Sequence, residues 1–225
     1  MAARAVKPLS QDRIVRAALA VIDKEGVEAF TLERVATKLG VRAPSLYNHV
    51  SSRAAIIEGV RDLVVAEMDY SKFDTERWDV ALEAWARSYR EAFAAHPNTV
   101  TLLYTTPVNS DGAFEMYEAV TSGLGRSGWP AEMTVPILAS VEYLIAGSVL
   151  DRAAAGTMFG HAEERGAVTV VRALKVAGSQ VEFSDEVFEL GLSALLDGLR
   201  RRFRTLRADT SARSARSRPP VAARR

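Results

Sequence analysis

Apolar residues recur every three or four positions along most of this chain, a spacing typical of helices that bury one face. The first such pattern covers residues 11–25, and Ser10 precedes it as a candidate cap. Further helical patterns cover residues 51–68, 77–95, 100–104, 111–127, 131–155 and 185–206, with a weaker one at 168–177. Since no segment alternates apolar and polar residues as a half-buried strand would, we predict an all-α fold.

Two short helical segments flank a glycine between residues 31 and 50. Thr31 is a candidate cap for the first segment, whose apolar face comprises Leu32, Val35, Ala36 and Leu39. Gly40 suits the left-handed turn that ends a helix, and Pro44 suits the first turn of the next one. Such a pair forms a helix-turn-helix, whose second helix can enter the major groove of DNA.

The predicted second helix of this pair has one apolar side and an otherwise polar surface. Leu46 and Val50 are four residues apart and point the same way. The other faces carry side chains that can donate to phosphates or base edges, namely Arg42, Ser45, Tyr47, Asn48 and His49. An ordinary helical hairpin with a polar outer face fits the same pattern, so the motif alone leaves both interpretations open.

Composition narrows the chemistry that the chain can carry. Its 225 residues allow one or two domains with a sizeable core. The chain has no cysteine, so it can form no disulfides. Its three histidines lack the spacing of metal ligands, so we expect no metal site. We find no catalytic motif and expect no enzymatic activity and no cofactor. We find no apolar run of about 20 residues and no signal-peptide core, and therefore expect a cytoplasmic protein outside the membrane.

Charge is distributed unevenly although the net charge is only +1. Residues 1–62 carry a net charge of +3, residues 63–199 carry −11, and residues 200–225 carry +9. Only the two ends therefore suit a polyanion, and DNA should repel the body. The Ser, Ala, Arg and Pro content of residues 208–225 predicts a disordered tail, which is either a solvated charge run or a source of non-specific DNA affinity.

Three runs near the N-terminus together resemble a known DNA-binding domain. They are Gly26–Thr31, Val35–Val41 and Pro44–Val50, the last followed by Ser52-Arg53-Ala54. They are similar to the TetR family of bacterial repressors over residues 10–62, and most similar to its tetracycline-repressor branch. Weaker similarity continues through Thr105-x-Pro107, Gly147-x-Val-Leu-Asp151 and Phe188-x-x-Gly-Leu192.

The resemblance implies a division of the chain and a function. We expect an arm at residues 1–9, a three-helix helix-turn-helix domain at 10–55, a helical effector-binding and dimerisation domain at 56–207, and the tail at 208–225. The implied protein is a repressor that binds a palindromic operator in double-stranded DNA as a homodimer. A small, largely apolar effector would release it. The alternative is a DNA-binding regulator or activator without a small-molecule ligand.

Individual DNA contacts carry over to matching positions of this sequence. The resemblance implies phosphate-positioning roles for Thr31, Pro44, Tyr47, His49 and Arg53. Candidate base contacts are Arg42, Ser45 and Asn48, where Arg suits guanine and Asn suits adenine. Ala43 and Asn48 replace an amide and an aromatic residue of the tetracycline branch, so we expect a different operator sequence.

The two long late helical segments are the predicted dimer interface. Both carry broad apolar faces with small residues that allow close approach, including Ala139, Gly147, Gly191, Ala194 and Gly198. In the family resembled, the corresponding helices pair with their copies in a four-helix interface. A helix pair inside a monomeric core is the alternative.

Aromatic residues concentrate between positions 78 and 143 and suggest an effector pocket. The candidate effector contacts are Trp85, Tyr89, Leu102, Tyr104, Phe114, Tyr117 and Tyr143. An aromatic stripe at helical spacing also fits a plain core, so each residue has both interpretations. Thr105 and Asp151 match the tetracycline branch, but Leu102 stands where that branch has a metal-binding His. We therefore expect neither a metal ion nor tetracycline in the pocket.

Overall fold

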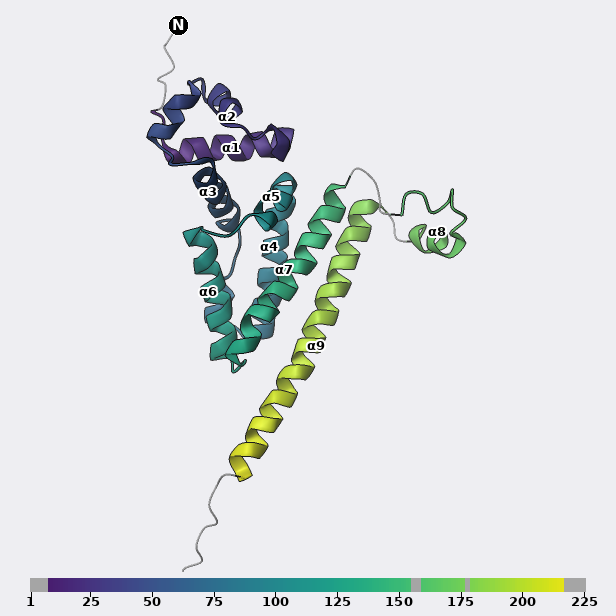
Figure 1. The fold of residues 1–225 in the computed structure, drawn as a ribbon. Coiled ribbons are helices and arrows are strands. Elements are labelled where there is room, and N and C mark those ends of the chain that lie inside the picture. The colour runs from purple at the N-terminus through teal and green to yellow at the C-terminus, as the bar shows by residue number, and fades with distance from the viewer. Residues whose placement is uncertain (1–7, 155–158, 177–178, 217–225) are drawn as a thin grey trace, which may run out of the picture.

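The computed structural model describes residues 8–154, 159–176 and 179–216, and every regular element in these ranges is helical (Figure 1). The predicted all-α fold is therefore confirmed. The α-helices are α1 (Gln11–Glu25), α2 (Leu32–Leu39), α3 (Arg53–Val65), α4 (Trp78–Ala95), α5 (Val100–Thr105), α6 (Asp111–Arg126), α7 (Ala131–Ala153), α8 (Val168–Leu174) and α9 (Gln180–Arg216). Short 3-10 helices join them at Val27–Ala29 (η1), Ala43–Asn48 (η2), Ser71–Asp74 (η3) and Pro97–Thr99 (η4).

The caps predicted for the first helices are present. The Ser10 hydroxyl accepts from the Arg13 amide at 3.3 Å, and the Thr31 hydroxyl accepts from the Arg34 amide at 3.1 Å. Gly40 ends α2 in the left-handed region, with φ at 70°. These contacts satisfy backbone groups that have no partner inside the helix, so both helix ends are set locally.

The segment after this turn differs from the prediction, because η2 is a 3-10 helix instead of an α-helix. Its amides bond three residues back, as Ser45 N does to Arg42 O and His49 N to Leu46 O, both at 2.9 Å. Pro44 occupies its first turn and has no amide to donate. Ser52 caps the next helix, so the segment is confined to six residues, which is still long for a 3-10 helix.

We use the name head for the part of the chain from α1 to η2, which rests on the first turns of α3 (Figure 1). The interior of the head holds fully buried aliphatic side chains, among them Ile14, Ile22 and Leu46, and Ile56 of α3 is fully buried in the same core. Gly59 allows α1 and α3 to approach closely, because a Cβ there would lie 2.5 Å from the Cγ2 of buried Val15. The head is therefore packed directly onto α3.

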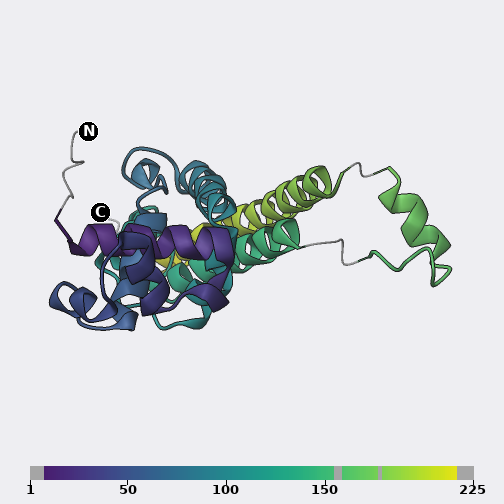
Figure 2. The same ribbon diagram turned by 90° about the horizontal axis from the view of Figure 1, so that it is seen from above.

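The remaining helices form a body in which α4 is central. It packs against α7, and α7 lies side by side with α9 in both views of the ribbon (Figures 1 and 2). Trp85 on α4 is fully buried against Phe73 and Tyr89. Arg90 of α4 donates to Ser148 of α7 and to Asp185 near the start of α9, at 2.7 Å each. The short α8 projects away from this bundle in both views.

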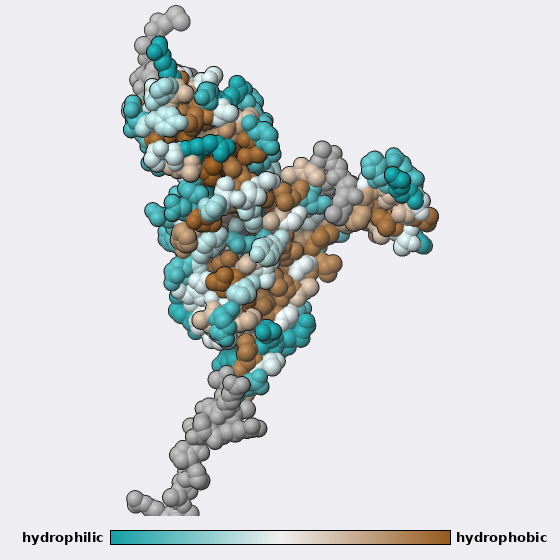
Figure 3. Space-filling view, in the orientation of Figure 1, coloured by the Kyte–Doolittle hydropathy of each residue, from teal (hydrophilic) through white to brown (hydrophobic). Residues whose placement is uncertain are grey.

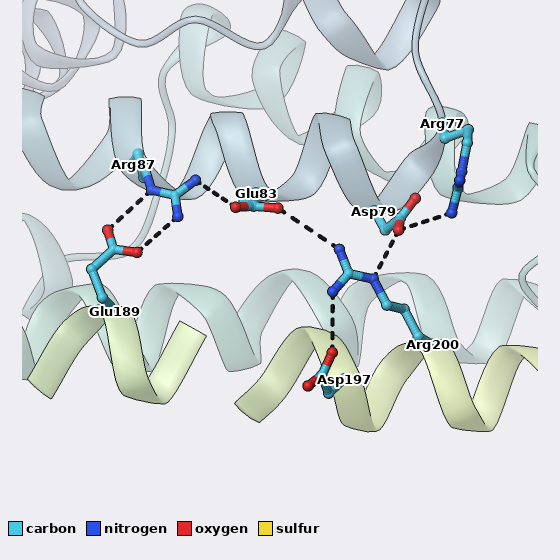
Figure 4. Close-up of polar contacts among 7 residues, drawn as sticks. All are labelled: Arg77, Asp79, Glu83, Arg87, Glu189, Asp197 and Arg200. Atoms are coloured by element: carbon cyan, nitrogen blue, oxygen red, sulfur yellow. Dashed lines mark hydrogen bonds and ion pairs between the residues drawn. The ribbon is translucent and has the colours of Figure 1, made fainter. Parts of the chain in front are cut away.

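A charged ladder fastens α4 to the inner side of α9 (Figure 4). Arg87 holds Glu189 through two bonds of 3.0 and 2.7 Å. Farther along, Arg200 donates to Asp79 at 2.8 Å, and the Asp79 side chain is only 4% exposed. Glu83 lies between the two arginines. The two ends of this stretch of α9, at Glu189 and Arg200, are therefore each joined to α4 by ion pairs.

The late helices correct three expectations. α9 extends from Gln180 to Arg216, beyond the predicted 185–206 at both ends. The tail expected from residue 208 is thus helical up to Arg216, because its Ala and Arg residues favour helix, and 217–225 lie outside the described residues. α7 is also apolar and long enough to cross a membrane by length and composition, contrary to our expectation. It packs against α4, α6 and α9, as a core helix does.

Candidate nucleic-acid interface and interior cavity

The outer surface of η2 carries three consecutive exposed side chains. They are Tyr47, Asn48 and His49, and Tyr47 is 57% exposed. Leu46 and Val50 on either side are buried and hold the segment on the head. Within the described part of the chain, none of the three exposed side chains has a polar partner. Their donors and acceptors are therefore open to an external partner.

The other residues predicted to contact DNA lie in or beside η2. Arg42 and Pro44 are exposed, whereas Ala43 and Ser45 are half-buried. Thr31 is exposed at the start of α2, where its hydroxyl already accepts from the helix.

Arg53 is the first residue of α3 and is exposed, with its guanidinium 4.6 Å from the centre of the Phe30 ring. This stacking fixes the direction of the side chain without using its hydrogen-bond donors. All nine predicted residues thus lie in or beside η2, at the start of α2 or at the start of α3. Their contact with DNA stays a prediction.

A cavity of about 220 Å³, open to solvent where the exposed Tyr143 forms its rim, lies in the body between α3, α4, α5, α6 and α7. Four of the predicted effector residues line it: Tyr89, Tyr104, Tyr117 and Tyr143. The other lining residues are Arg61, Phe93, Leu103, Thr106, Val108 and Glu142. The wall is therefore a ring of tyrosines with one acid and one base.

Hydrogen bonds connect the polar groups of this cavity. The Tyr89 hydroxyl donates to Glu142 Oε1 at 3.0 Å, and the Tyr104 hydroxyl donates to the Glu142 carbonyl oxygen at 3.1 Å. Burial raises the pKa of Glu142 above its ordinary value, although bonds from Tyr89 and Tyr117 oppose the shift. Burial also raises the pKa of Tyr104 and Tyr117, which keeps their hydroxyls protonated. The cavity can thus both donate hydrogen bonds to a ligand and accept them.

Three predicted effector residues do not line the cavity. Trp85 is a core residue, and Leu102 is buried in α5 while its neighbour Leu103 forms the wall. Phe114 lies on α6 and is 56% exposed. Their contact with an effector stays a prediction, and they lie away from this cavity because spacing along a helix identifies a face but does not show whether that face meets a neighbour, a cavity or solvent.

Arg61 and Glu142 were missed as cavity residues. Glu142 is a charged side chain in an otherwise apolar stretch of α7, and this interruption was the signal that could have identified it, whereas Arg61 lies beside Asp62 and close to Glu58 and carried no such signal. Arg61 is 6% exposed and donates to Leu103 O at 2.8 Å and Thr106 O at 3.2 Å. It therefore joins α3 to the end of α5.

Two more side chains of α3 reach the segment that follows α5. Glu58 accepts from the Asn109 amide at 3.0 Å. Asp62 accepts from the Gly112 amide at 3.1 Å and from the Ser110 hydroxyl. The polar face of α3 is thus attached to residues 103–112, which form one wall of the cavity.

The residues that match the tetracycline branch have other contacts. The Thr105 hydroxyl donates to Thr101 O at 2.6 Å, within its own helix. Asp151 lines a separate hollow of about 370 Å³ between α7 and α9. Within the described residues, no group of three or more His, Asp or Glu side chains is arranged to hold a metal ion.

Comparison with known proteins assigns a family to both parts of the chain. Residues 14–60 match the bacterial regulatory proteins of the tetR family, and residues 72–203 match the tetracyclin repressor-like C-terminal domain. The chain is 28% identical to the tetracycline repressor protein class A from transposon 1721 of Escherichia coli over 200 residues, which cover 86% of this chain and 92% of the relative. It is also 30% identical to the tetracycline repressor protein class E of Escherichia coli, and the match covers 65% of this chain and 70% of that relative.

A solved structure gives the same picture of the fold. ActR of Streptomyces coelicolor in complex with (S)-DNPA superimposes with a TM-score of 0.69 and 27% sequence identity. The match covers 86% of this chain and 98% of ActR. The similarity therefore extends over the head and the body together.

Proposed function

Since the chain belongs to the TetR family of DNA-binding transcriptional repressors, we propose that it binds a palindromic operator as a homodimer and leaves it when a small effector enters the interior cavity. The observation that carries this proposal is the outer surface of η2. It presents Tyr47, Asn48 and His49 to solvent without a partner in the described residues, on a segment held rigidly by buried Leu46. Such a segment can insert into a major groove without rearrangement.

A dimer is proposed because one six-residue helix reads few base pairs, whereas a two-fold pair reads two half-sites about 34–36 Å apart. The outward side of α7 and α9 offers an apolar face for it, seen as brown patches along the body in Figure 3. On α7 this face includes Tyr143, which is 73% exposed, and on α9 it includes Leu190, which is 72% exposed. Exposed apolar area of this kind typically marks an interface.

The glycines of α7 and α9 distinguish the outward face of these helices from the face where they pack against each other. A Cβ at Gly147 or Gly198 would meet nothing within 4 Å, so both positions face space that a partner helix could fill. Gly191 differs, because a Cβ there would lie 2.8 Å from the Leu144 side chain. Gly191 thus serves packing between α7 and α9 of one chain.

For the effector we propose a flat, largely apolar molecule that carries a few hydroxyl or carbonyl groups and binds without a metal ion. Aromatic walls suit its body, and the tyrosine hydroxyls with Glu142 suit its polar groups. The complex of ActR with (S)-DNPA supports a small-molecule ligand in a relative of this fold. Leu102 supports the absence of a metal, because an aliphatic side chain offers no ligand atom.

The route from the cavity to DNA passes through α3. Arg61 lines the cavity and lies eight residues after Arg53, about 12 Å along one helix. A ligand that displaces Arg61 from Leu103 O and Thr106 O would shift α3 against the body. The head would move with α3, and two heads no longer one DNA turn apart could not occupy successive major grooves.

Selection of binding sites from random duplex DNA tests the proposal. We expect an inverted repeat whose half-sites are separated by one helical turn, and selection of no common sequence would refute operator binding. A thermal-shift screen against flat hydroxylated compounds then identifies effectors, since a ligand of the native state raises the melting temperature. Calorimetry with a chelator present completes the test. An effector whose binding disappears with the chelator would contradict the metal-free site.

A further inference from the structure

A second hollow lies at the end of the body farthest from the head, between the start of α4, the turn from α6 to α7, and the last third of α9 (Figure 1). Its volume is about 470 Å³, within the range of small-molecule sites and larger than the interior cavity. Its lining comprises Arg77, Trp78, Ser127, Arg200, Phe203, Arg204 and Arg207. Four arginines around two aromatic rings are an unusual composition for a surface recess.

The floor of this hollow is rigid and aromatic. The Trp78 ring lies 5.4 Å from Phe203 and 5.2 Å from buried Trp129, measured between ring centres. Gly128 at the turn adopts a φ of 103°, which favours glycine. Trp78 is only 7% exposed, so the half-buried Phe203 is the aromatic side chain that a flat ring of a ligand can contact.

The rim of the hollow is cationic and partly fixed. Figure 4 shows Arg77 and Arg200 converging on Asp79, at 3.1 and 2.8 Å. The Asp79 side chain is 4% exposed, so it holds the two guanidinium groups from below and leaves them facing the hollow. Arg204 is exposed and has no acidic partner among the described residues. Its five donors are thus available to an incoming anion.

We propose that this hollow binds a small aromatic anion, with the ring packed against Phe203 and a carboxylate or phosphate held by Arg204 and Arg77. The planar fork of arginine matches both acid groups, and arginine also stacks on flat rings. The position of the hollow argues against DNA as the occupant, because duplex bound by η2 lies at the opposite end of the chain (Figure 1). The site is separate from the interior cavity and does not depend on the effector proposed for it.

Isothermal titration of the full-length protein with three naphthalene probes tests the site. 1-Naphthyl phosphate and 1-naphthoate carry the two possible acid groups, and neutral 1-naphthol has the same ring. We expect both anions to bind at least about tenfold more tightly than 1-naphthol, since charge-assisted bonds to arginine are strong. The tighter of the two anions identifies the acid group that the site prefers. Equal affinity of 1-naphthol and the anions would overturn the proposal.

Two neighbouring arginines of α9 provide the matched variants. Arg204→Gln should weaken binding of the preferred anion about tenfold, whereas Arg201→Gln should leave it unchanged, because exposed Arg201 does not line the hollow. Equal affinities for the two variants would place the binding elsewhere, the interior cavity included, and would refute the proposed site.

Discussion

The head and the body use their polar side chains in opposite ways. On η2, Tyr47, Asn48 and His49 are exposed and have no polar partner among the described residues. Between α4 and α9, in contrast, charged side chains are paired within the chain, as Asp79 is with Arg200 and Arg87 with Glu189. Groups of the first kind are available to an external molecule, while groups of the second kind hold the fold together. Substitutions in the two regions should therefore affect different measurements.

The largest effect is expected from the apolar face of α7 and α9, which is proposed to join two copies of the chain. Leu190→Arg places a charge on this face, so we expect a monomer that binds the selected operator about 100-fold or more weakly. Sedimentation velocity and gel shifts measure the two losses. Val80→Arg is the matched control, because Val80 is an exposed apolar residue of α4 outside this face. A dimeric Leu190→Arg protein would move the interface elsewhere.

Substitutions on η2 should change DNA binding and leave stability within about 0.5 kcal/mol. We expect Tyr47→Ala to weaken binding to every duplex, because it removes a phosphate contact. Asn48→Ala should instead cost about 1–3 kcal/mol on the selected operator only, since base contacts discriminate among sequences. Gel shifts on selected and scrambled DNA separate the two. Equal losses on both duplexes would assign Asn48 to the backbone contacts.

Substitutions in the charged ladder between α4 and α9 should instead change the stability of the fold. Asp79→Asn removes the buried charge that holds Arg77 and Arg200, and we expect it to lower the free energy of unfolding by about 1–3 kcal/mol. Glu83→Gln, at a side chain 33% exposed, should cost less than about 1 kcal/mol. Urea unfolding at pH 7 measures both, and equal costs would contradict a special role of Asp79.

The pH dependence of this contribution follows from the Asp79 pKa. Burial alone would raise that pKa, but the bond from Arg200 and the two nearby guanidinium charges lower it below 3.8. The stabilisation by Asp79 is therefore present above its unfolded-state pKa and is lost as the pH falls through the folded-state value. The difference in unfolding free energy between wild type and Asp79→Asn should shrink in acid.

The smallest effect is expected where the head meets the body. His96 bonds Asp23 of α1 at 2.9 Å and Glu67, just beyond α3, at 3.2 Å. Burial opposes charging of the ring, but these two bonds outweigh it and raise the His96 pKa above 6.5. The stabilisation is thus complete below about pH 6.5 and is lost as the pH rises through the higher folded-state pKa.

We expect His96→Asn to lower the melting temperature more at pH 6 than at pH 8.5, by an amount equivalent to about 1 kcal/mol or less. Differential scanning calorimetry at the two pH values makes this measurement. His161→Asn is the control, because His161 is exposed in the segment before α8. The same loss at both pH values would show that His96 acts through packing instead of charge.

The sequence predicted local features of the fold better than features that depend on several helices. Ser10, Thr31 and Gly40 determine helix ends through bonds to their own neighbours, and all three were identified correctly. The end of α9 was placed too early, because the Ser, Ala, Arg and Pro content of the tail was taken as a sign of disorder although alanine and arginine favour helix.

The residues of the interior cavity were also only partly predictable from the sequence. Its tyrosines were predicted from composition, but Trp85 and Phe114 could not be distinguished from them, since burial and exposure depend on which helices become neighbours. Arg61 and Glu142 come from helices 81 residues apart in sequence and meet only through the tertiary fold. The spacing of residues along one helix does not predict such a contact between helices that are distant in sequence.

The close approach at Gly59 gives the head the mechanics of a lever. Because α1 packs closely on α3 where Val15 meets Gly59, we expect the two helices to move together. A small turn of α3 about its attachment at Arg61 and Asp62 is then amplified at η2, in proportion to its distance from that pivot. A larger side chain at position 59 would push α1 away from α3 and should weaken the transmission of a rotation of α3 to η2.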